Sequence, residues 1–240
     1  MVLSAKALFI AIRIRTLVAS IAPVLIGSSL SYSYGLFSAD IFLYTLLAAI
    51  FIQIGTNFAN DLYDFLKGAD NENRVGPLRA VQAQLISVKK MKALMILSFL
   101  VAILFGFPLV LKGGMPILVI GILSIISGYL YTAGPYPLGY NGWGDFFVFC
   151  FFGPIAVCGT FFLQAKHVSI ESILAGIILG CLSVTLLCIN NIRDEGTDKE
   201  AGKRTLAVRL GVGFVRVMFI ILFLISYFLA GYLTYGLPYL

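Results

Sequence analysis

Two short polar motifs hold most of the side chains that could carry out chemistry. Residues 57–64 read Asn-Phe-Ala-Asn-Asp-Leu-Tyr-Asp, and residues 190–198 read Asn-Asn-Ile-Arg-Asp-Glu-Gly-Thr-Asp. In each motif an aspartate follows an asparagine after four residues, and a second aspartate comes three or four residues later. Such spacings put side chains on one face of a helix. Each motif therefore predicts a ladder of oxygen ligands. The ladders are Asn57, Asp61 and Asp64 in the first motif, and Asn190, Asp194 and Asp198 in the second.

Oxygen ligands of this kind suit Mg²⁺, which usually takes one or two carboxylates together with the phosphate oxygens of a substrate. Two facing ladders would hold Mg²⁺ ions with a diphosphate between them. We expect the four aspartates to bind metal directly or through water, and Asn57 and Asn190 to orient them. Basic side chains follow both motifs and could neutralise the remaining phosphate charge. They are Lys67, Arg74, Arg79, Lys199, Lys203 and Arg204.

The composition indicates which elements must position these motifs. The chain has 240 residues, of which 60% are hydrophobic and 12% are charged, with a mean hydropathy of +0.99. A lipid bilayer is the natural solvent for so much apolar surface, and a spanning helix needs about 20 mostly apolar residues. The sequence therefore predicts an all-α transmembrane bundle of about seven spans, in a single domain over residues 1–240. The predicted spans are 16–36, 40–60, 93–111, 115–133, 145–164, 170–190 and 213–235.

The distribution of basic residues predicts the orientation of the bundle. Fifteen lysines and arginines lie in the N-terminal flank and in the long loops after the second and sixth spans, whereas only Lys112 and Lys166 lie on the other side. Because cytoplasmic loops are rich in lysine and arginine, the N-terminus and both polar motifs are predicted to be cytoplasmic. A bacterial inner membrane is the expected location.

Other features of the sequence are compatible with simpler roles. The net charge is +6, but no basic stripe with interleaved aromatic residues is present, so nucleic-acid binding is not expected. The four cysteines lie in apolar segments and are interpreted as buried apolar side chains. Gly176 and Gly180 are expected to let two helices pack closely. A transporter or another non-enzymatic membrane protein remains the rival class, which would place charges inside spans or break helices near the membrane centre. The sequence shows neither feature.

Five stretches of the chain resemble the UbiA superfamily of intramembrane prenyltransferases, and most of all its branch that prenylates 1,4-dihydroxy-2-naphthoate in menaquinone biosynthesis. The first motif continues into Lys67-Gly68-Ala69-Asp70 and Gly76-Pro77-Leu78-Arg79, and the second into Gly202-Lys203-Arg204-Thr205-Leu206. The other stretches are Arg15-Thr16-Leu17 with Ala22-Pro23, Tyr131 to Tyr140 with Gly144-Asp145, and Phe152-Gly153-Pro154 with Gly159-Thr160. Members of this superfamily usually have nine spans, so the chain is expected to lack the last two.

The resemblance implies Mg²⁺-dependent transfer of a polyprenyl group from polyprenyl diphosphate to 1,4-dihydroxy-2-naphthoate, with loss of the ring carboxylate, giving demethylmenaquinone. Lys67, Arg74, Arg79, Lys203 and Arg204 would contact the diphosphate, and the donor tail would lie among the spans with membrane lipid around them. Tyr131 would flank the acceptor or the allylic cation, whereas Tyr136 and Tyr140 fit an interfacial aromatic belt at least as well. Other acceptors such as 4-hydroxybenzoate remain open, and the sequence does not indicate an oligomeric state.

Overall fold

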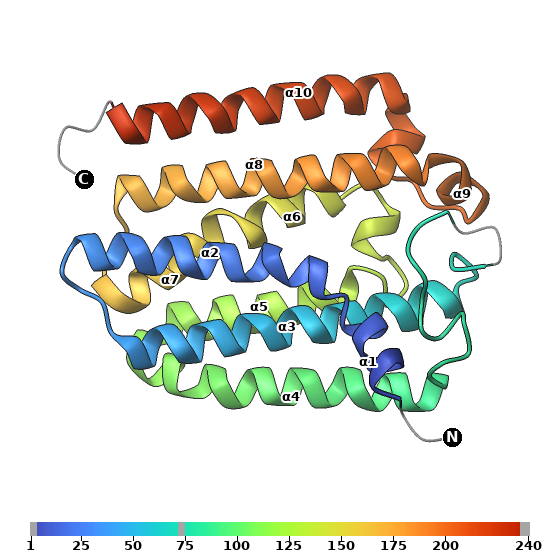
Figure 1. Ribbon diagram of the computed structural model, residues 1–240, viewed down its shortest axis with the longest axis horizontal. Coiled ribbons are helices and arrows are strands. Elements are labelled where there is room, and N and C mark those ends of the chain that lie inside the picture. The colour runs from blue at the N-terminus through green and yellow to red at the C-terminus, as the bar shows by residue number, and fades with distance from the viewer. Residues whose placement is uncertain (1–3, 72–74, 236–240) are drawn as a thin grey trace.

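The computed structural model describes residues 4–71 and 75–235, and helices make up nearly all of its regular structure. Figure 1 shows the long helices lying side by side, with the long polar loops gathered at one end of the bundle. The helices are α1 (Ala5–Ile12), α2 (Ile14–Ser33), α3 (Ala39–Leu66), α4 (Val88–Gly113), α5 (Met115–Leu130), α6 (Gly144–Phe152), α7 (Pro154–Ala165), α8 (Ile170–Arg193), α9 (Glu195–Glu200) and α10 (Leu206–Tyr235), with a 3₁₀ turn at Leu138–Tyr140.

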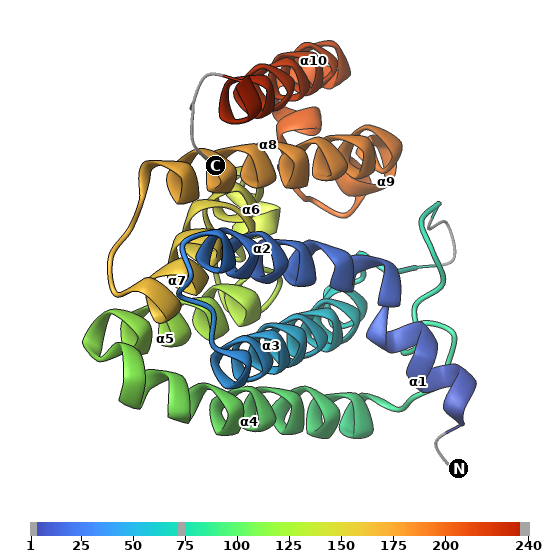
Figure 2. The same ribbon diagram turned by 60° about the vertical axis from the view of Figure 1, so that its left-hand side comes forward.

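Six segments of the described chain are long and apolar enough to cross a membrane: α2, α3, α4, α6 together with α7, α8, and α10. The apolar helix α5 is shorter, with 16 residues. All seven predicted spans are therefore helical, which confirms the all-α bundle. Figure 2 shows α10 at the edge of the bundle, where it packs mainly on α8.

The structure corrects the prediction of one continuous helix over residues 145–164. This span breaks at Gly153, between α6 and α7, where the backbone leaves helical geometry (φ −120°, ψ −110°). Pro154 has no backbone N–H, so it can begin α7 but cannot continue the ladder of hydrogen bonds from α6. The expectation that no span would be broken was therefore wrong.

Close packing against α8 accompanies this break. A Cβ atom added to Gly153 would lie 2.5 Å from the carbonyl oxygen of Gly176, and one added to Gly176 would lie 2.7 Å from Cα of Pro154. A Cβ on Gly180 would lie 2.8 Å from the backbone oxygen of Phe149. These contacts are to backbone atoms, which cannot rotate away. They confirm the packing role that the spacing of Gly176 and Gly180 predicts.

Replacing Gly176 by leucine is expected to destabilise the protein by about 1–3 kcal/mol, the usual cost of forcing a larger side chain into a packed interface. Unfolding in mixed detergent micelles would measure this loss. The matched control is Gly231→Leu in α10, because an added Cβ there meets no atom within 4 Å. Equal stability of the two variants would contradict the packing role of Gly176.

Candidate active site

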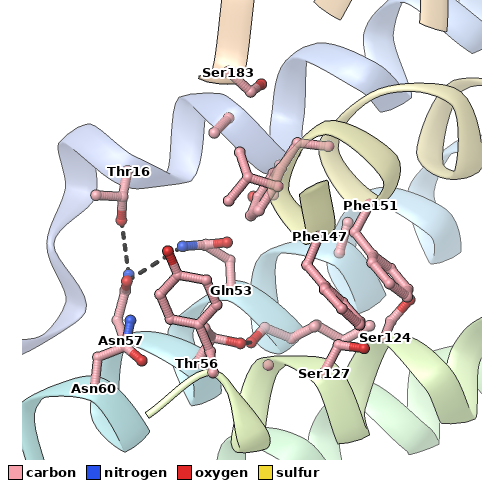
Figure 3. A pocket seen from close by; sticks show the side chains of 18 of the residues that line it. Thr16, Gln53, Thr56, Asn57, Asn60, Ser124, Ser127, Phe147, Phe151 and Ser183 are labelled. Atoms are coloured by element: carbon pink, nitrogen blue, oxygen red, sulfur yellow. Dashed lines mark hydrogen bonds between the residues drawn. The ribbon is translucent and has the colours of Figure 1, made fainter. Parts of the chain in front are cut away.

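A large cavity of about 1710 Å³ lies inside the bundle and joins the two polar motifs to the apolar spans. Its walls come mainly from α2 to α8, with contributions from α1, α9 and the polar loops, and most of its lining side chains are apolar or small. Figure 3 shows its polar part, where Thr16, Gln53 and Asn57 form a hydrogen-bonded chain and Phe147 and Phe151 face the same space. Eight charged residues line the cavity, and Asp64, Asp194, Asp198 and Lys203 belong to the end where the polar loops gather. The other four are Arg13, Arg15, Arg79 and Arg193.

The lysine Lys203 joins the two motifs at this end of the cavity. Its ammonium nitrogen Nζ lies 3.6 Å from Oδ1 of Asp64 and 3.4 Å from Oδ1 of Asp198. Asp64 is on α3 and Asp198 is on α9, so residues from both motifs meet around one positive charge. Only 14% of the Lys203 side chain is exposed, which keeps solvent screening of these ion pairs low.

The tyrosine Tyr140 completes this cluster from the loop between α5 and α6. Its hydroxyl donates a hydrogen bond of 2.8 Å to Oδ1 of Asp64, and its ring centre lies 4.8 Å from Nζ of Lys203 and 5.0 Å from Nζ of Lys67. Burial and the nearby Asp64 carboxylate raise the pKa of Tyr140, so the hydroxyl stays protonated and can donate. Of the two roles left open for Tyr140, these contacts favour a place in the polar cluster, whereas Tyr136 is exposed.

Burial also raises the pKa of Asp198, and the ammonium of Lys203 opposes this shift. A nearby cation therefore favours the ionised form of this carboxylate, whether that cation is Lys203 or one that arrives with a ligand. Such a carboxylate is suited to bind a cation that accompanies a phosphate group.

Comparisons with known proteins identify the family of this chain. The model of the UbiA prenyltransferase family matches residues 20–240. The chain belongs to this family. It is 39% identical over 206 residues to the 1,4-dihydroxy-2-naphthoate octaprenyltransferase of Escherichia coli. The aligned residues cover 83% of this chain and 67% of that protein. The enzyme of the same name from Haemophilus influenzae is 40% identical over 219 residues, covering 88% and 71%.

The fold of this UbiA family member is also similar to that of a solved structure. A UbiA homologue from Archaeoglobus fulgidus, bound to GPP and Mg²⁺, has a TM-score of 0.73 and 18% sequence identity, over 95% of this chain and 77% of that one. At this identity the likeness shows the shared bundle fold.

The structure of the UbiA bundle places Asp61 differently from the other predicted ligands. Its side chain is 1% exposed, and its two oxygens accept hydrogen bonds from the backbone N–H groups of Ala80 and Val81, at 2.9 and 3.0 Å. Asp61 does not line the cavity. Its carboxylate instead holds the loop between α3 and α4 against the helix.

Arg79 lies in the same loop and binds carboxylates of its own chain. Its Nη2 atom lies 3.3 Å from Oδ2 of Asp64, and its Nε atom lies 3.1 Å from Oδ2 of Asp70. Arg79 lines the cavity but is only 6% exposed. It therefore helps to hold Asp64 in place, while its Nη1 atom has no hydrogen-bond partner among the described residues.

The remaining predicted residues divide between the cavity and its surroundings. Asn57 donates to the backbone oxygen of Ile12 and to Thr16 and accepts from Gln53, so its side chain is fully engaged. Asp194 lines the cavity but has both oxygens bound to Arg193, at 2.7 and 2.6 Å. Asn190 and Tyr131 also line the cavity.

The basic residues at the rim are less closely involved. Nζ of Lys67 donates to the backbone oxygen of Gly134, 3.1 Å away, and also lies near the ring of Tyr140. The side chain of Arg204 is exposed and does not line the cavity, whereas its backbone N–H donates to the oxygen of Tyr140. The prediction for Arg74 lies outside the described residues.

Sequence reasoning missed Asn60 as a lining residue. Asn60 lines the cavity, and its Oδ1 atom accepts a hydrogen bond from Thr132. The signal was present, because Gln53, Asn57, Asn60 and Asp64 follow one another at spacings of four, three and four. This stripe is the cavity face of α3, and Asp61 lies about 100° of helical rotation away from Asn60.

The carboxylates of the cluster are too few to hold Mg²⁺ without other ligands. Within residues 4–71 and 75–235, no three aspartate, glutamate, histidine or cysteine side chains form a metal site by themselves. Mg²⁺ bound with a diphosphate needs fewer, because phosphate oxygens and water supply the other ligands. Asp64 and Asp198 already flank one cation, the ammonium of Lys203. These two carboxylates therefore fit an Mg²⁺–diphosphate group.

Proposed function

We propose that this protein transfers a polyprenyl group from polyprenyl diphosphate to 1,4-dihydroxy-2-naphthoate and releases diphosphate and CO₂. The observation that carries the proposal is the meeting of Asp64, Lys203 and Asp198 at the polar end of a large apolar cavity. The names of the relatives that are 39% and 40% identical support the naphthoate acceptor. The product is demethylmenaquinone in its quinol form.

The bonds balance without an added oxidant or proton. The C–O bond of the allylic diphosphate breaks, and its electron pair leaves with the diphosphate. A new C–C bond forms between C1 of the prenyl chain and the ring carbon that carries the carboxylate. That carboxylate leaves as CO₂, and the electron pair of its C–C bond returns to the ring.

Residues of the protein support each part of this reaction. When Mg²⁺ is bound, it supplies positive charge that stabilises the leaving diphosphate. Asp64 and Asp198 would hold the metal, and Asn60, Asp194 and Asn190 offer further oxygens along the same two helix ends. Lys203 and Lys67 lie at the rim, where they would contact diphosphate oxygens. Such electrostatic stabilisation is usually the largest contribution to catalysis.

The apolar part of the cavity would protect the allylic cation from water. Phe147, Phe151 and Tyr131 are aromatic lining residues, and the faces of aromatic rings attract cations by about 0.5–2 kcal/mol. The hydroxyl of Tyr140 would keep Asp64 oriented toward the reacting diphosphate. Tyr140 is therefore proposed as a positioning residue.

An assay of the purified protein in detergent with octaprenyl diphosphate and 1,4-dihydroxy-2-naphthoate tests the function. We expect a prenylated naphthoquinol, equimolar CO₂ and dependence on Mg²⁺. Parallel reactions with 4-hydroxybenzoate serve as the acceptor control. If only 4-hydroxybenzoate gives a product, the proposed naphthoate acceptor is wrong. If neither acceptor gives a product, the proposed enzymatic role is wrong.

Replacing Tyr140 by phenylalanine is expected to lower kcat/KM for the prenyl diphosphate by about tenfold or more, because a hydrogen bond to a charged group contributes roughly 1.5–3 kcal/mol. The ring, and with it the contacts to Lys67 and Lys203, is retained. Tyr140→Leu removes both and should reduce kcat/KM further. Steady-state kinetics would measure kcat/KM of both variants. Equal kcat/KM of Tyr140→Phe and the wild type would contradict the positioning role.

We also propose a bacterial inner membrane as the location, with the N-terminus and the loops of the active site in the cytoplasm. The basic residues support this orientation, since Lys112 and Lys166 meet at the opposite end of the bundle, where Nζ of Lys166 donates to the backbone oxygen of Lys112. Labelling of single cysteines placed at Lys199 and Lys112 in intact and permeabilised cells would test it. Reaction at position 199 in intact cells would contradict the proposed orientation.

A further inference from the structure

The ring of Tyr131 lies in the cavity wall beside two glycines. A Cβ atom added to Gly139 would lie 2.9 Å from Cε1 of this ring, and one added to Gly144 would lie 2.8 Å from its hydroxyl oxygen. The backbone N–H of Gly139 also donates to the carbonyl oxygen of Tyr131, 2.9 Å away. Because a larger residue at either glycine would displace the ring, the backbone here fixes the direction of the Tyr131 hydroxyl, which lies beside the first residue of α6.

The hydroxyl of Tyr131 lies near the proposed Mg²⁺–diphosphate site. Tyr131 lines the cavity, and no hydrogen bond joins its hydroxyl to another of the described residues. The charged groups that interact with it electrostatically are the carboxylates of Asp145, Asp64 and Asp198 and the guanidinium of Arg13. Asp64 and Asp198 are the two carboxylates that would hold the metal. An acceptor bonded to the Tyr131 hydroxyl therefore has its ring near the diphosphate, beside C1 of the donor.

Asp145 directly follows Gly144 and has an oxygen to spare. Its side chain is 9% exposed and does not line the cavity, and its buried Oδ1 atom has no hydrogen-bond partner among the described residues. The helix dipole at the start of α6 favours a negative charge there but leaves that oxygen unpaired. The carboxylate also interacts with the thiol of Cys188, and a thiol is only a weak donor. The Tyr131 hydroxyl is a stronger donor that interacts with the same carboxylate.

We propose that the Tyr131 hydroxyl accepts a hydrogen bond from the acceptor hydroxyl next to the reacting ring carbon, and that Asp145 is the positioning residue that turns the Tyr131 proton away from the cavity. The proposal rests on the proposed function. A tyrosine hydroxyl has one proton and can also accept. When the charge of Asp145 attracts this proton, a lone pair of the same oxygen is left to face the acceptor.

The bond-forming step is the point at which this hydrogen bond would matter. In free 1,4-dihydroxy-2-naphthoate, the hydroxyl at C1 of the ring donates to the neighbouring carboxylate. When the prenyl chain bonds to C2, that carbon becomes tetrahedral and the carboxylate turns out of the ring plane. The hydroxyl loses its partner while its oxygen gives electron density to the ring, so its proton needs a new acceptor. An interaction made mainly in the transition state raises the rate of the chemical step.

No proton has to leave the acceptor in this scheme. The hydroxyl proton stays on its oxygen and is hydrogen-bonded to Tyr131 while the ring carries positive charge. Loss of CO₂ then returns the electron pair of the C–C bond to the ring, which restores the aromatic quinol. Tyr131 and Asp145 therefore finish the reaction in the protonation states in which they began.

Replacing Asp145 by asparagine removes the charge and keeps the shape of the side chain. We expect the single-turnover rate of prenyl transfer to fall by about tenfold or more, with KM for both substrates and the Mg²⁺ requirement changed by less than about twofold. Tyr131→Phe should show a similar loss. The double variant should be no slower than Tyr131→Phe by more than about twofold, because Asp145 then has no hydroxyl to orient. Rapid-quench measurements would give all three rates.

Gly144→Ala tests the same hydrogen bond while Asp145 is retained. Its Cβ atom would lie 2.8 Å from the Tyr131 hydroxyl oxygen, so it should push the hydroxyl aside and slow the chemical step as Asp145→Asn does. The matched control is Gly231→Ala in α10, where an added Cβ meets no atom within 4 Å, and we expect the wild-type rate for it. Unfolding in mixed micelles would be measured for every variant.

The outcomes separate this proposal from the proposed function. A wild-type protein without product contradicts the proposed function, whereas with an active wild type the variants bear on the present proposal alone. A wild-type rate in Asp145→Asn would overturn it, and so would losses from Tyr131→Phe and Asp145→Asn that multiply in the double variant. A slower Asp145→Asn with a lower unfolding midpoint or a raised KM for the donor would make the role of Asp145 structural, which also overturns the proposal.

Discussion

Replacing Asp64 or Asp198 by asparagine is expected to lower kcat of prenyl transfer by about 10²–10³-fold, the usual effect of removing one group that stabilises charge in a transition state. The two carboxylates lie on either side of the Lys203 ammonium, at 3.6 and 3.4 Å, so each is placed to hold Mg²⁺ with the diphosphate. Asparagine keeps the shape of the side chain but removes the charge that attracts a divalent cation.

A shift in the Mg²⁺ requirement would separate this role from a general loss of structure. Residual activity of both variants should need a higher Mg²⁺ concentration than the wild type for half-maximal rate. Glu200→Gln is the matched control, because it removes one negative charge from the exposed end of α9. Wild-type kinetics are expected for that variant. Full activity of Asp64→Asn and Asp198→Asn would contradict the proposed metal site.

The positions of the spans were predictable because partition into lipid depends mainly on local composition. Each of the seven predicted apolar stretches is helical in the structure. The break at Gly153 was not predicted, because hydropathy is insensitive to backbone hydrogen bonding. Pro154 signals a break, yet proline is tolerated within helices elsewhere in this chain, at Pro23 and Pro108. What distinguishes Gly153 is its contact with Gly176 and Gly180, which is a property of the packed bundle.

The chemical character of the site was also predictable, but the direction of individual side chains was not. The spacing of Asn57 and Asp61 places both near one helical face, but the structure shows that Asn57 faces the cavity with Asn60 and Asp64, whereas Asp61 does not line it. One residue of helix corresponds to a rotation of about 100°, so neighbouring carboxylates can face a cavity and a loop. The partners of Asp61 come from residues 80 and 81, beyond the reach of a local pattern.

Tyr140 shows a second limit. It follows a stretch rich in glycine and proline whose path no periodicity describes, and its three partners come from α3 and from the loop after α9. Such contacts exist only once the ends of several helices have been brought together. The sequence could identify an aromatic residue near the membrane boundary, but only the fold shows that its hydroxyl holds Asp64.

Replacing Asp61 by asparagine is expected to destabilise the protein by about 1–3 kcal/mol, a larger effect on stability than that of any other aspartate in the two motifs. The carboxylate is buried and accepts hydrogen bonds from two backbone N–H groups, of Ala80 and Val81. An amide has only one oxygen to accept with, and its own NH₂ group would then face a backbone N–H. Leaving one buried donor without a partner costs about 1–3 kcal/mol.

The loop that Asp61 holds also carries Arg79, the partner of Asp64. Destabilising this loop should therefore lower activity indirectly, because Asp64 loses a contact that positions it. Unfolding by sodium dodecyl sulfate in mixed micelles would measure the change in stability, with Glu200→Gln again as the charge-matched control. Prenyl transfer by Asp61→Asn should recover at low temperature, where the folded state predominates, and its Mg²⁺ requirement should match the wild type. A wild-type unfolding midpoint combined with a raised Mg²⁺ requirement would instead make Asp61 a metal ligand, because only direct coordination changes the affinity for the ion without changing the stability of the loop.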